Sequence, residues 1–178
     1  MSVVISAAVT AGLMYFVTPL MFPGASKGII QTKTLSLSNS AYIADSSTAN
    51  YLLMNTTTLN ITTRGDTIID ARFTASAFIT TDTTFTGVTS FFVALVIAGV
   101  GNRTIMARYL DTQPATGFYR EISVNLDIEY ATAALPAGTY TISVMWISSY
   151  SIAGNNYLMA NTNSLKTPRM LIVQEIAP

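Results

Sequence analysis

Apolar and polar residues alternate along three stretches of this chain. Between Thr67 and Ile79 every second side chain is apolar, and most of the side chains between them are polar. Phe118–Tyr130 and Tyr140–Trp146 show the same alternation, and Trp146 falls on the apolar phase. A period of two is typical of antiparallel strands that turn one face to a core and the other to solvent. These stretches therefore predict three half-buried strands.

Other parts of the chain predict further strands and two long loops. Phe91–Val100 is apolar throughout, and its β-branched and aromatic content favours a central strand buried on both faces. Loops are expected at Thr80–Thr89 and Ser148–Thr167, which are rich in Thr, Asn and Ser. Less regular strands are expected at Thr34–Leu37, Tyr51–Ile61, Arg103–Leu110 and Met170–Ile176. The sum is about eight strands, which predicts an all-β fold, a two-sheet antiparallel β-sandwich of which the jelly roll is one form.

A hydrophobic segment precedes these strands. The first 26 residues carry no charged side chain, and Val3–Phe22 is long enough to cross a bilayer core as a helix of about 20 residues. We therefore divide the chain into an anchor or assembly segment, 1–26, and a β-sandwich domain, 27–178, with a linker at Gly24–Thr34. The large apolar residues expected to make the contacts of the segment are Val3, Val4, Ile5, Val9, Leu13, Met14, Phe16, Val17, Leu20 and Phe22.

The N-terminal segment has three interpretations. A cleavable signal peptide would fit the small residues Gly24–Ser26, but no Lys or Arg precedes the apolar run. A membrane helix would fit the small residues within Ala7–Gly12, which let another helix approach closely. The third is an assembly segment buried among neighbouring subunits, either as a helix in a filament core or as a donated strand.

The composition narrows the classes of function. Charged residues make up 10% of the chain, against about 25% in ordinary soluble domains, and nine basic residues balance nine acidic ones. Nucleic-acid binding needs clustered Lys and Arg, so this balance argues against it. Hydroxyl groups replace charge, since 26 residues are threonine. A surface of this kind is expected in an extracellular or virion setting.

The missing residue types exclude several kinds of site. The chain has no Cys and no His, which removes disulfides, zinc sites, thiol nucleophiles and Ser-His-Asp arrangements. Gly99–Gly101 precedes neither a predicted helix nor a Lys-Ser/Thr pair, so it is not a phosphate loop. We expect no cofactor, no metal and no enzymatic activity.

One carboxylate pair remains as a candidate for chemistry. Asp127 and Glu129 lie two positions apart on the outward face of one predicted strand. Paired carboxylates act in acid–base catalysis or hold Ca²⁺. Exposed strand faces carry such pairs routinely, and no pocket signature accompanies this one. Trp146 lies on the inward phase, which favours core packing over a carbohydrate platform.

Arginine and asparagine supply the other candidate residues. Arg103, Arg108, Arg120 and Arg169 lie in or near predicted strands, where they can form ion pairs across subunits or within the chain. Their expected acidic partners are Asp111, Glu121, Asp127 and Glu175. Asn55, Asn60 and Asn102 each begin an Asn-x-Thr sequence, the acceptor pattern for N-glycosylation.

These features together resemble a class of structural proteins. The Val3–Phe22 segment, the Thr-, Ser- and Asn-rich β-domain, the absence of Cys and His and the closing strand Pro168–Ile176 resemble structural proteins of archaeal viruses and subunits of archaeal surface filaments. The resemblance covers the chain in outline and contains no diagnostic motif. Archaeal pilins and archaellins have a long continuous N-terminal helix, whereas Pro19 and Pro23 interrupt this segment.

The resemblance implies a non-enzymatic structural subunit of a virion. The N-terminal segment would embed in a membrane or in neighbouring subunits, and the sandwich would form the shell, turret or tail. One alternative is a subunit of an archaeal extracellular filament or pilus, and another is a membrane-anchored carbohydrate- or ligand-binding domain. The expected partners are copies of the chain, other structural subunits and membrane lipid, with no nucleic acid, at the virion or the extracellular surface.

Overall fold

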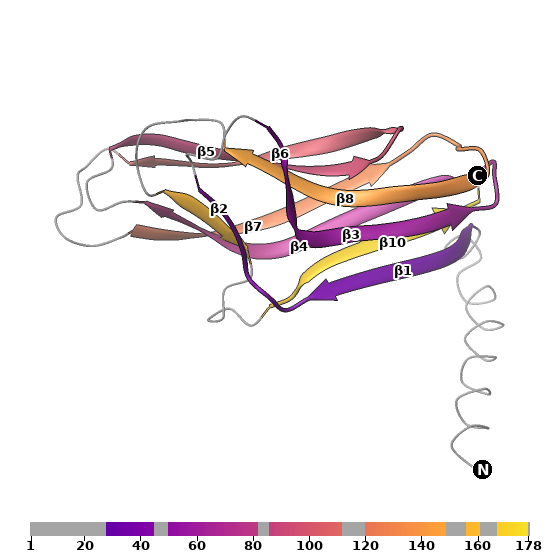
Figure 1. The fold of residues 1–178 in the computed structure, drawn as a ribbon, viewed down its shortest axis with the longest axis horizontal. Helices are drawn as coiled ribbons and strands as arrows, with labels where there is room; N and C mark the ends of the chain where they lie inside the picture. Colours follow the sequence, from indigo (N-terminus) through magenta and orange to yellow (C-terminus); the bar gives the residue numbers. More distant parts are fainter. Residues whose placement is uncertain are drawn as a thin grey trace, which may run out of the picture.

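The computed structural model describes residues 28–44, 50–81, 86–111, 120–148, 156–160 and 167–177. This part of the chain forms ten strands in two antiparallel sheets that pack face to face (Figure 1). The all-β sandwich predicted from the alternation is therefore confirmed. The predicted N-terminal segment, including every residue named within Val3–Phe22, lies outside the described residues. Within the described ranges, no helix long and apolar enough to cross a membrane is found.

Ten strands follow one another along the described chain. They are β1 (Ile29–Leu37), β2 (Ala41–Ala44), β3 (Leu52–Thr63), β4 (Ile68–Thr81), β5 (Gly87–Ile97), β6 (Gly101–Asp111), β7 (Arg120–Ala131), β8 (Gly138–Ser148), β9 (Tyr157–Ala160) and β10 (Arg169–Ile176).

The strand order is that of a jelly roll. One sheet contains β1, β10, β4, β9, β2 and β7, and the other has the order β3-β8-β5-β6. β1 with β2, and β9 with β10, each act as one interrupted strand, because β1 pairs with β10 and β2 pairs with β9. If each interrupted strand is counted once, β1 and β2 are strand 1, β3 to β8 are strands 2 to 7, and β9 and β10 are strand 8. The two sheets then have the orders 1-8-3-6 and 2-7-4-5. The pairs 4-5, 3-6, 2-7 and 1-8 are the rungs of one long hairpin, which is the folding pattern of a jelly roll.

Alternation along the strands places the core between the sheets. Inward positions of β4, including Phe73, are fully buried, and so are Phe91 of β5 and Val144 of β8. Trp146 is 2% exposed and belongs to the same core, as its phase predicts. Each sheet therefore covers the inner face of the other, and the outer faces remain free to differ.

The predicted boundaries need correction in several places. β9 lies inside the predicted loop Ser148–Thr167, and β1 begins at Ile29, inside the predicted linker. The predicted loop Thr80–Thr89 is too long, because its first two residues end β4 and Thr89 is a buried residue of β5. Threonine suits both loops and strands, so its abundance hides where each strand ends.

The predicted strand Phe91–Val100 also differs from the structure. β5 ends at Ile97, and Val100 N–H donates to Ile97 O (3.0 Å) across a tight turn in which Gly99 has a φ of 75°. β5 is central in its sheet, between β8 and β6, but it is not buried on both faces. Phe92 and Val96, on its outer face, are partly exposed.

A buried carboxylate fastens the first strand to the body of the domain. Glu175 of β10 is fully buried and accepts hydrogen bonds from Arg64 N–H (2.7 Å), Thr67 Oγ1 (3.0 Å) and Gln31 Nε2 (2.6 Å). Burial alone would raise the pKa of Glu175, but these hydrogen bonds outweigh it and hold the pKa below its ordinary value. One side chain thus joins β1, β10 and the turn between β3 and β4.

Candidate assembly surface

The outer face of the β3-β8-β5-β6 sheet carries an apolar patch. In register, Leu53 of β3 lies opposite Met145 of β8, and Met145 lies opposite Ala94 of β5. Neighbouring positions of the same phase bring Phe92 opposite both Ile147 of β8 and Met106 of β6. We define the apolar patch as Leu53, Phe92, Ala94, Val96, Met106 and Met145.

This patch is partly open to solvent in the single chain, although Ala94 within it is buried. Leu53 is 47% exposed and Met106 is 50% exposed, and Tyr51 beside them is 42% exposed. A hollow of about 190 Å³ is lined by Tyr51, Ala94, Val96, Asn102 and Met145, with the small side chain of Ala94 among them. Contiguous exposed apolar residues of this kind mark sites of interaction with a protein or a membrane.

Polar residues surround the patch. Toward the β5–β6 turn, the outer face becomes hydroxyl-rich, with Thr58 of β3 opposite Ser143 of β8 and Thr62 opposite Thr139. Thr62 Oγ1 and Thr139 Oγ1 lie 3.0 Å apart and share a hydrogen bond. On the other side, Arg108 of β6 is the first charged residue met along the face. An apolar centre with a polar rim is the usual anatomy of a protein interface.

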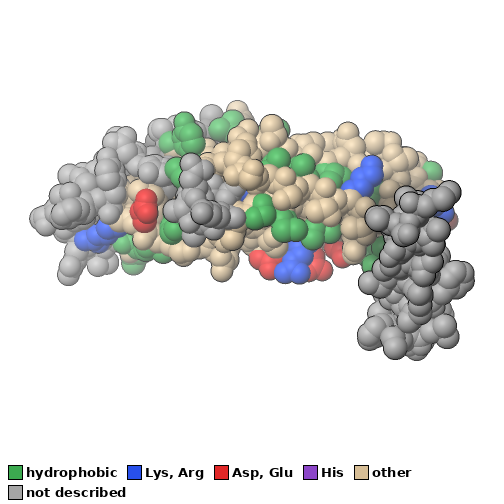
Figure 2. Space-filling view, turned by 90° about the horizontal axis from the view of Figure 1, so that it is seen from below, with side chains coloured by type: hydrophobic (Ala, Val, Ile, Leu, Met, Phe, Trp, Pro, Cys, Tyr) green, Lys and Arg blue, Asp and Glu red, His purple; other side chains and the backbone are tan. Residues whose placement is uncertain are grey.

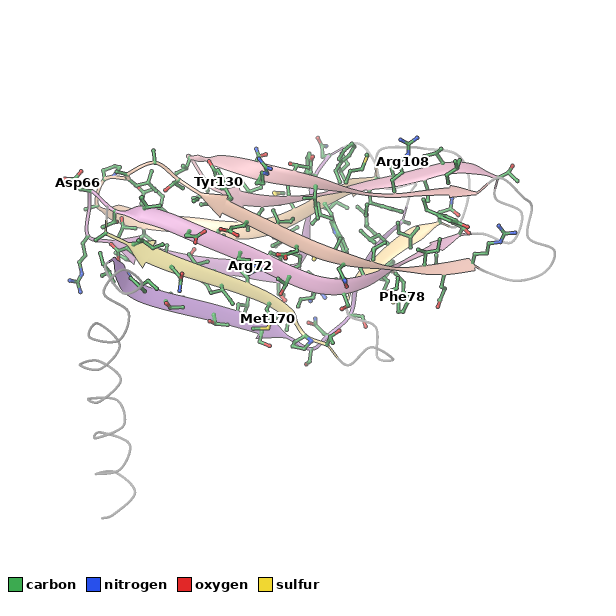
Figure 3. All side chains as sticks on the ribbon, turned by 180° about the vertical axis from the view of Figure 1, so that it is seen from behind. Asp66, Arg72, Phe78, Arg108, Tyr130 and Met170 are labelled. Atoms are coloured by element: carbon green, nitrogen blue, oxygen red, sulfur yellow. The ribbon has the colours of Figure 1, made fainter. Side chains whose placement is uncertain are left out.

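The outer face of the opposite sheet is different in character. Figure 3 views this face, where Arg72 points outward from β4, with Phe78 and Met170 at other points of the same surface. Arg72 forms a bidentate ion pair with Asp127 of β7, through Nε–Oδ1 (3.0 Å) and Nη2–Oδ2 (2.7 Å). Figure 2 shows basic and acidic side chains side by side along one rim of the molecule. This face is solvated by charge and hydroxyl groups.

The predicted carboxylate pair lies on this charged face, on β7 beside Arg72 of β4. Asp127 binds Arg72 directly, and Glu129 lies opposite Arg72 in the strand register. The hydrogen bond from Arg72 holds the pKa of Asp127 below its ordinary value. Because its charge is neutralised by Arg72 and both partners are about half exposed, Asp127 lacks the raised pKa expected of a general acid.

Asp70, beside this pair on β4, has the opposite shift. Burial, and then the charge of Glu129, raise the pKa of Asp70 and outweigh the effect of Arg72. Its Oδ1 atom is buried without a hydrogen-bond partner among the described residues. A hollow of about 260 Å³ is lined by Asp70, Arg72, Glu129, Ile172 and Gln174. Within the described ranges, no group of three or more acidic side chains is placed to hold a metal ion.

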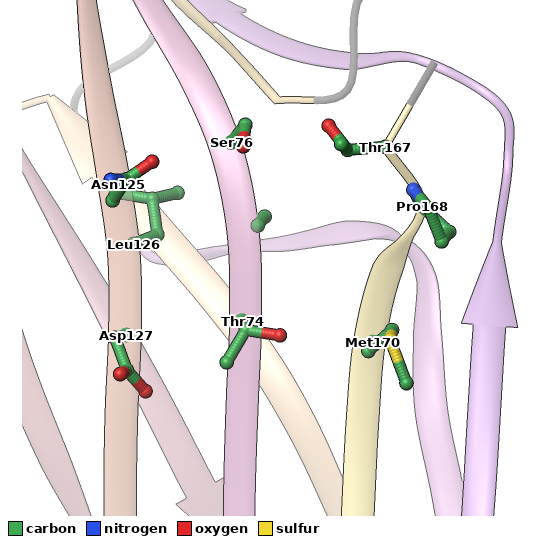
Figure 4. A pocket seen from close by; sticks show the side chains of 9 residues that line it. Thr74, Ser76, Asn125, Leu126, Asp127, Thr167, Pro168 and Met170 are labelled. Carbon is green, nitrogen blue, oxygen red and sulfur yellow. The ribbon is translucent and has the colours of Figure 1, made fainter. Parts of the chain in front are cut away.

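A second hollow on the same sheet has no convergent chemistry. It has a volume of about 380 Å³ and lies over β4, β7 and the start of β10. Figure 4 shows Thr74 and Ser76 on β4, Asn125 and Asp127 on β7, and Thr167 across the hollow, set apart from one another. Since Asp127 is already engaged by Arg72, the hollow presents separate polar groups and no matched set.

The four arginines predicted for an interface fall in different environments. Arg103 and Arg108 are exposed on β6, and Arg120 is partly exposed at the start of β7. Arg169 is only 1% exposed, so it is not available to an outer surface. Its Nη2 donates to Asn39 Oδ1 (2.9 Å), and burial lowers its pKa. Two expected acidic partners, Asp127 and Glu175, are bound within the chain instead.

All three asparagines of the glycosylation pattern are on the surface. Asn55, Asn60 and Asn102 are exposed. Asn55 lies in an irregular part of β3, where Thr56 has a φ of 58° and the register with β8 shifts. Asn102 also lines the hollow beside the apolar patch.

The sequence alone does not predict the apolar patch, although three of its residues lie within Phe91–Val100. Because both phases of Phe91–Val100 are apolar, the sequence predicts burial on both faces. The same pattern arises when one phase faces the core and the other faces a partner. Met145 and Ile147, on the outward phase of β8, are the signal that distinguishes these two cases, because a solvated face would carry polar residues there.

Distant structural similarities connect this chain to known proteins. No protein-family model matches the chain, and no curated protein matches it in sequence. It is similar to dimeric latent PorU from Porphyromonas gingivalis, at 10% identity over 86% of this chain and 14% of that one, with a TM-score of 0.39. It is also similar to a structure of particles derived from infectious bursal virus, at 13% identity over 82% of this chain and 37% of that one, with a TM-score of 0.32.

A third similarity is to a family two carbohydrate esterase from Cellvibrio japonicus, at 14% identity over 83% of this chain and 35% of that one, with a TM-score of 0.24. The chain spans less than two fifths of the length of each of these proteins. The likeness to proteins of viral particles is therefore weak, and these similarities do not carry a function to this chain.

Proposed function

We propose that this protein is a non-enzymatic structural subunit of a virion, and that copies of it assemble through the apolar patch. The observation that carries the proposal is the contrast between the patch and the rest of the surface. Leu53 and Met106 are about half exposed on the two edge strands of a sheet whose inner face is packed, and Phe92, Val96 and Met145 between them are partly exposed. Partly exposed apolar side chains at such a position are stabilised when a partner covers them.

The fold is compatible with this role, but it is also compatible with other roles. Jelly rolls build viral shells, and they also form lectins and cupins. A lectin or an enzyme would be expected to gather polar side chains around a cleft. The hollow over Thr74, Ser76 and Asn125 has separated polar groups, and the ion pair with Arg72 occupies the carboxylate beside it. The apolar patch therefore favours assembly over ligand binding.

The composition supports the same proposal. The apolar patch contains no charged residue, and the chain has a formal net charge of zero. An interface of this kind depends on apolar burial, so its strength changes little with salt or pH. That property suits a particle that must remain assembled outside a cell.

Assembly by strand donation, as in some filaments, has less support. A donated strand completes a sheet that lacks one. Here each sheet already has its four strand positions filled by the chain's own residues, in the full 1-8-3-6 and 2-7-4-5 order. The virion hypothesis needs no missing strand, since the outer face of a complete sheet serves as the contact.

Electron microscopy and sedimentation of the full-length chain from its native source test the proposal. We expect closed particles, or a defined oligomer that sediments well above the 19.1 kDa of one chain. Raising the salt concentration should leave the particles intact. Monomers at all concentrations, with or without detergent, would contradict the proposal.

A further inference from the structure

We infer that the buried guanidinium of Arg169 holds a small inorganic anion, such as chloride, inside the domain. The inference goes beyond the proposed function and does not depend on assembly. It rests on the position of Arg169, on the lack of a counter-charge among the described residues, and on N–H groups that have no acceptor there.

Arg169 begins β10 and points into the sandwich. It shares the phase of Leu171 and Val173, which are fully buried in the core. Pro168 and Met170, on either side of it, line the hollow on the outer face instead (Figure 4). The side chain of Arg169 is only 1% exposed. Since a guanidinium is not deprotonated in proteins, a positive charge is buried at this point.

No carboxylate that the structure describes neutralises this charge. Glu175 shares the inward phase of β10, but it lies six residues away, about 20 Å along the strand, and binds Arg64 N–H. Burial is accordingly the cause that shifts the pKa of Arg169, and it lowers that pKa. The other acidic side chains of the described part of the chain lie on the outward phases of β4 and β7 or in the turn between β3 and β4, and they are Asp66, Asp70, Glu121, Asp127 and Glu129. An unpaired buried charge is strongly unfavourable, so a counter-ion is expected.

The guanidinium also has N–H groups without acceptors. Nη2 of Arg169 donates to Asn39 Oδ1 (2.9 Å) and to Asn55 O (3.4 Å), both of which are neutral. Nε and Nη1 are buried and have no hydrogen-bond partner among the described residues. Of the five N–H donors of a guanidinium, one is on Nε and two are on Nη1. Buried donors without acceptors are rare, and an ordered water or ion is a common explanation.

Interruptions in both sheets meet around Arg169. β1 ends opposite Arg169, and Asn39 lies in the gap before β2 begins. In the other sheet, β3 has a register shift that contains Asn55 and Thr56, whose φ is 58°. Bulges redirect side chains and end strand pairing, which is why they are frequent beside functional sites. The fold thus supplies polar groups from both sheets to the guanidinium at a point where regular pairing stops.

Burial determines the class of ligand. A side chain that is 1% exposed can contact only a ligand small enough to be enclosed with it, which excludes nucleotides and oligosaccharides. An anion accepts hydrogen bonds and donates none, and this matches a group that has donors only. Water would satisfy the N–H groups but would leave the charge unpaired. Chloride satisfies both requirements and is close to water in size.

Thermal unfolding of the full-length chain at increasing chloride concentration tests the inference. Sodium gluconate replaces sodium chloride so that the ionic strength is constant, and gluconate is too large to enter an enclosed site. We expect the melting temperature to rise by about 3–5 °C for each tenfold increase in chloride above the dissociation constant. A melting temperature that is independent of chloride would overturn the inference, because water alone would then satisfy Arg169.

Arg169→Gln and Arg103→Gln form a matched pair of variants. Each removes one positive charge, but Arg103 is exposed on β6. Arg169→Gln should abolish the dependence of the melting temperature on chloride, and Arg103→Gln should retain it. If the two variants respond equally to chloride, the effect is a general action of salt and the inference is wrong.

A second measurement uses the natural chain and therefore does not depend on the folding of Arg169→Gln. Crystals of the full-length protein are grown in sodium bromide, and anomalous scattering locates the bromide ions. We expect a bromide ion in direct contact with Nε or Nη1 of Arg169. Bromide only at exposed basic residues, or a carboxylate of a neighbouring copy beside Arg169, would overturn the inference. Neither result concerns the apolar patch, so the proposed function stands or fails separately.

Discussion

The two sheets of this domain have similar inner faces and dissimilar outer faces. Inside, β4 and β5 contribute the same kind of side chain, and Phe73 and Phe91 are both fully buried. Outside, β4 presents Arg72 in an ion pair with Asp127, whereas β5 presents Phe92 and Val96 to solvent. The inner faces explain why the chain folds. The outer faces differ, and the proposed function assigns the charged face to water and the apolar face to a partner.

The difference cannot arise from the needs of the fold alone. A sandwich is stable when each sheet has one apolar face and one solvated face, as the sheet containing β4 and β7 has. The β3-β8-β5-β6 sheet is apolar on both faces near Met145 and Ala94. An additional apolar face lowers the solubility of a monomer, which is why we propose that a partner covers it.

The largest expected effect is on assembly, from a charge placed in the apolar patch. Met145→Glu would bury an unpaired carboxylate in the interface, which costs about 3–5 kcal/mol. That is a loss of at least about 100-fold in the association constant of each contact. Sedimentation of the full-length variant should show monomers where the natural chain shows particles.

Thr74→Glu, on the charged face, is the matched control for that comparison. It adds the same charge at a partly exposed position of the opposite sheet and should leave the particles unchanged. Urea unfolding of both variants separates assembly from folding. Particles that survive Met145→Glu but not Thr74→Glu would reverse the assignment of the two faces.

The next largest effect is on stability and comes from Glu175, the buried carboxylate that fastens β1 to the body of the domain. Glu175→Ala removes the acceptor of Arg64 N–H and Thr67 Oγ1, whereas Gln31 Nε2 still donates to Thr62 O. The two donors left without a partner should together lower the free energy of unfolding by about 3 kcal/mol. Since the pKa of Glu175 is lowered in the folded state, its contribution is present at neutral pH and is lost as the pH falls below 4.5 and through the folded pKa. The natural chain should therefore lose stability in acid, and Glu175→Ala should lose less over the same range. If the free energy of unfolding falls equally with pH in the two proteins, Glu175 is not responsible for the loss of stability in acid.

A smaller effect is expected from the ion pair of the charged face. Arg72 and Asp127 are 53% and 54% exposed, and exposed pairs contribute about 0.2–1 kcal/mol. A double-mutant cycle with Arg72→Ala and Asp127→Ala should give a coupling in this range that decreases with added salt. A coupling above about 2 kcal/mol would mean that the face is shielded from water by a partner.

The smallest effect should come from Asp70, and it should have the opposite sign. Because the pKa of Asp70 is raised in the folded state, its charged form is disfavoured by folding at neutral pH, and this cost disappears as the pH falls through the folded pKa. Asp70→Asn should therefore raise the free energy of unfolding at pH 7 by less than about 1 kcal/mol, and the gain should vanish in acid. Thermal unfolding at the two pH values measures the difference. A loss of stability at neutral pH would mean that Arg72 outweighs burial.

The parts of the fold that can be predicted from the sequence are the strands with one buried face and one solvent-exposed face. β4, β7 and β8 alternate cleanly because solvent selects polar residues on one phase, and their positions were predicted to within a few residues. β9 was missed because four residues are too few to display a period among polar neighbours. Glu175 was expected to pair with an arginine, since nothing in the sequence shows that the β3–β4 turn brings Arg64 N–H and Thr67 to it.

The candidate surface could be predicted only in part. The apolar run in β5 was recognised, but the sequence does not show whether the second apolar phase faces its own core or another molecule. That distinction depends on which strands cover β5, and β8 and β6 lie beside it and not above it. The arginines show the same limit, since Arg169 and Arg103 have similar local sequence contexts but only Arg169 is buried.

Thiol labelling of assembled particles tests most directly that the apolar patch is the covered side of the domain. Full-length Met145→Cys and Thr74→Cys chains are assembled and exposed to a soluble maleimide, and each is compared with the same chain after dissociation. Assembly should strongly slow the labelling of Met145→Cys and leave that of Thr74→Cys unchanged. If Met145→Cys reacts equally fast in particles and in separated chains, the patch is not an interface and the account is wrong.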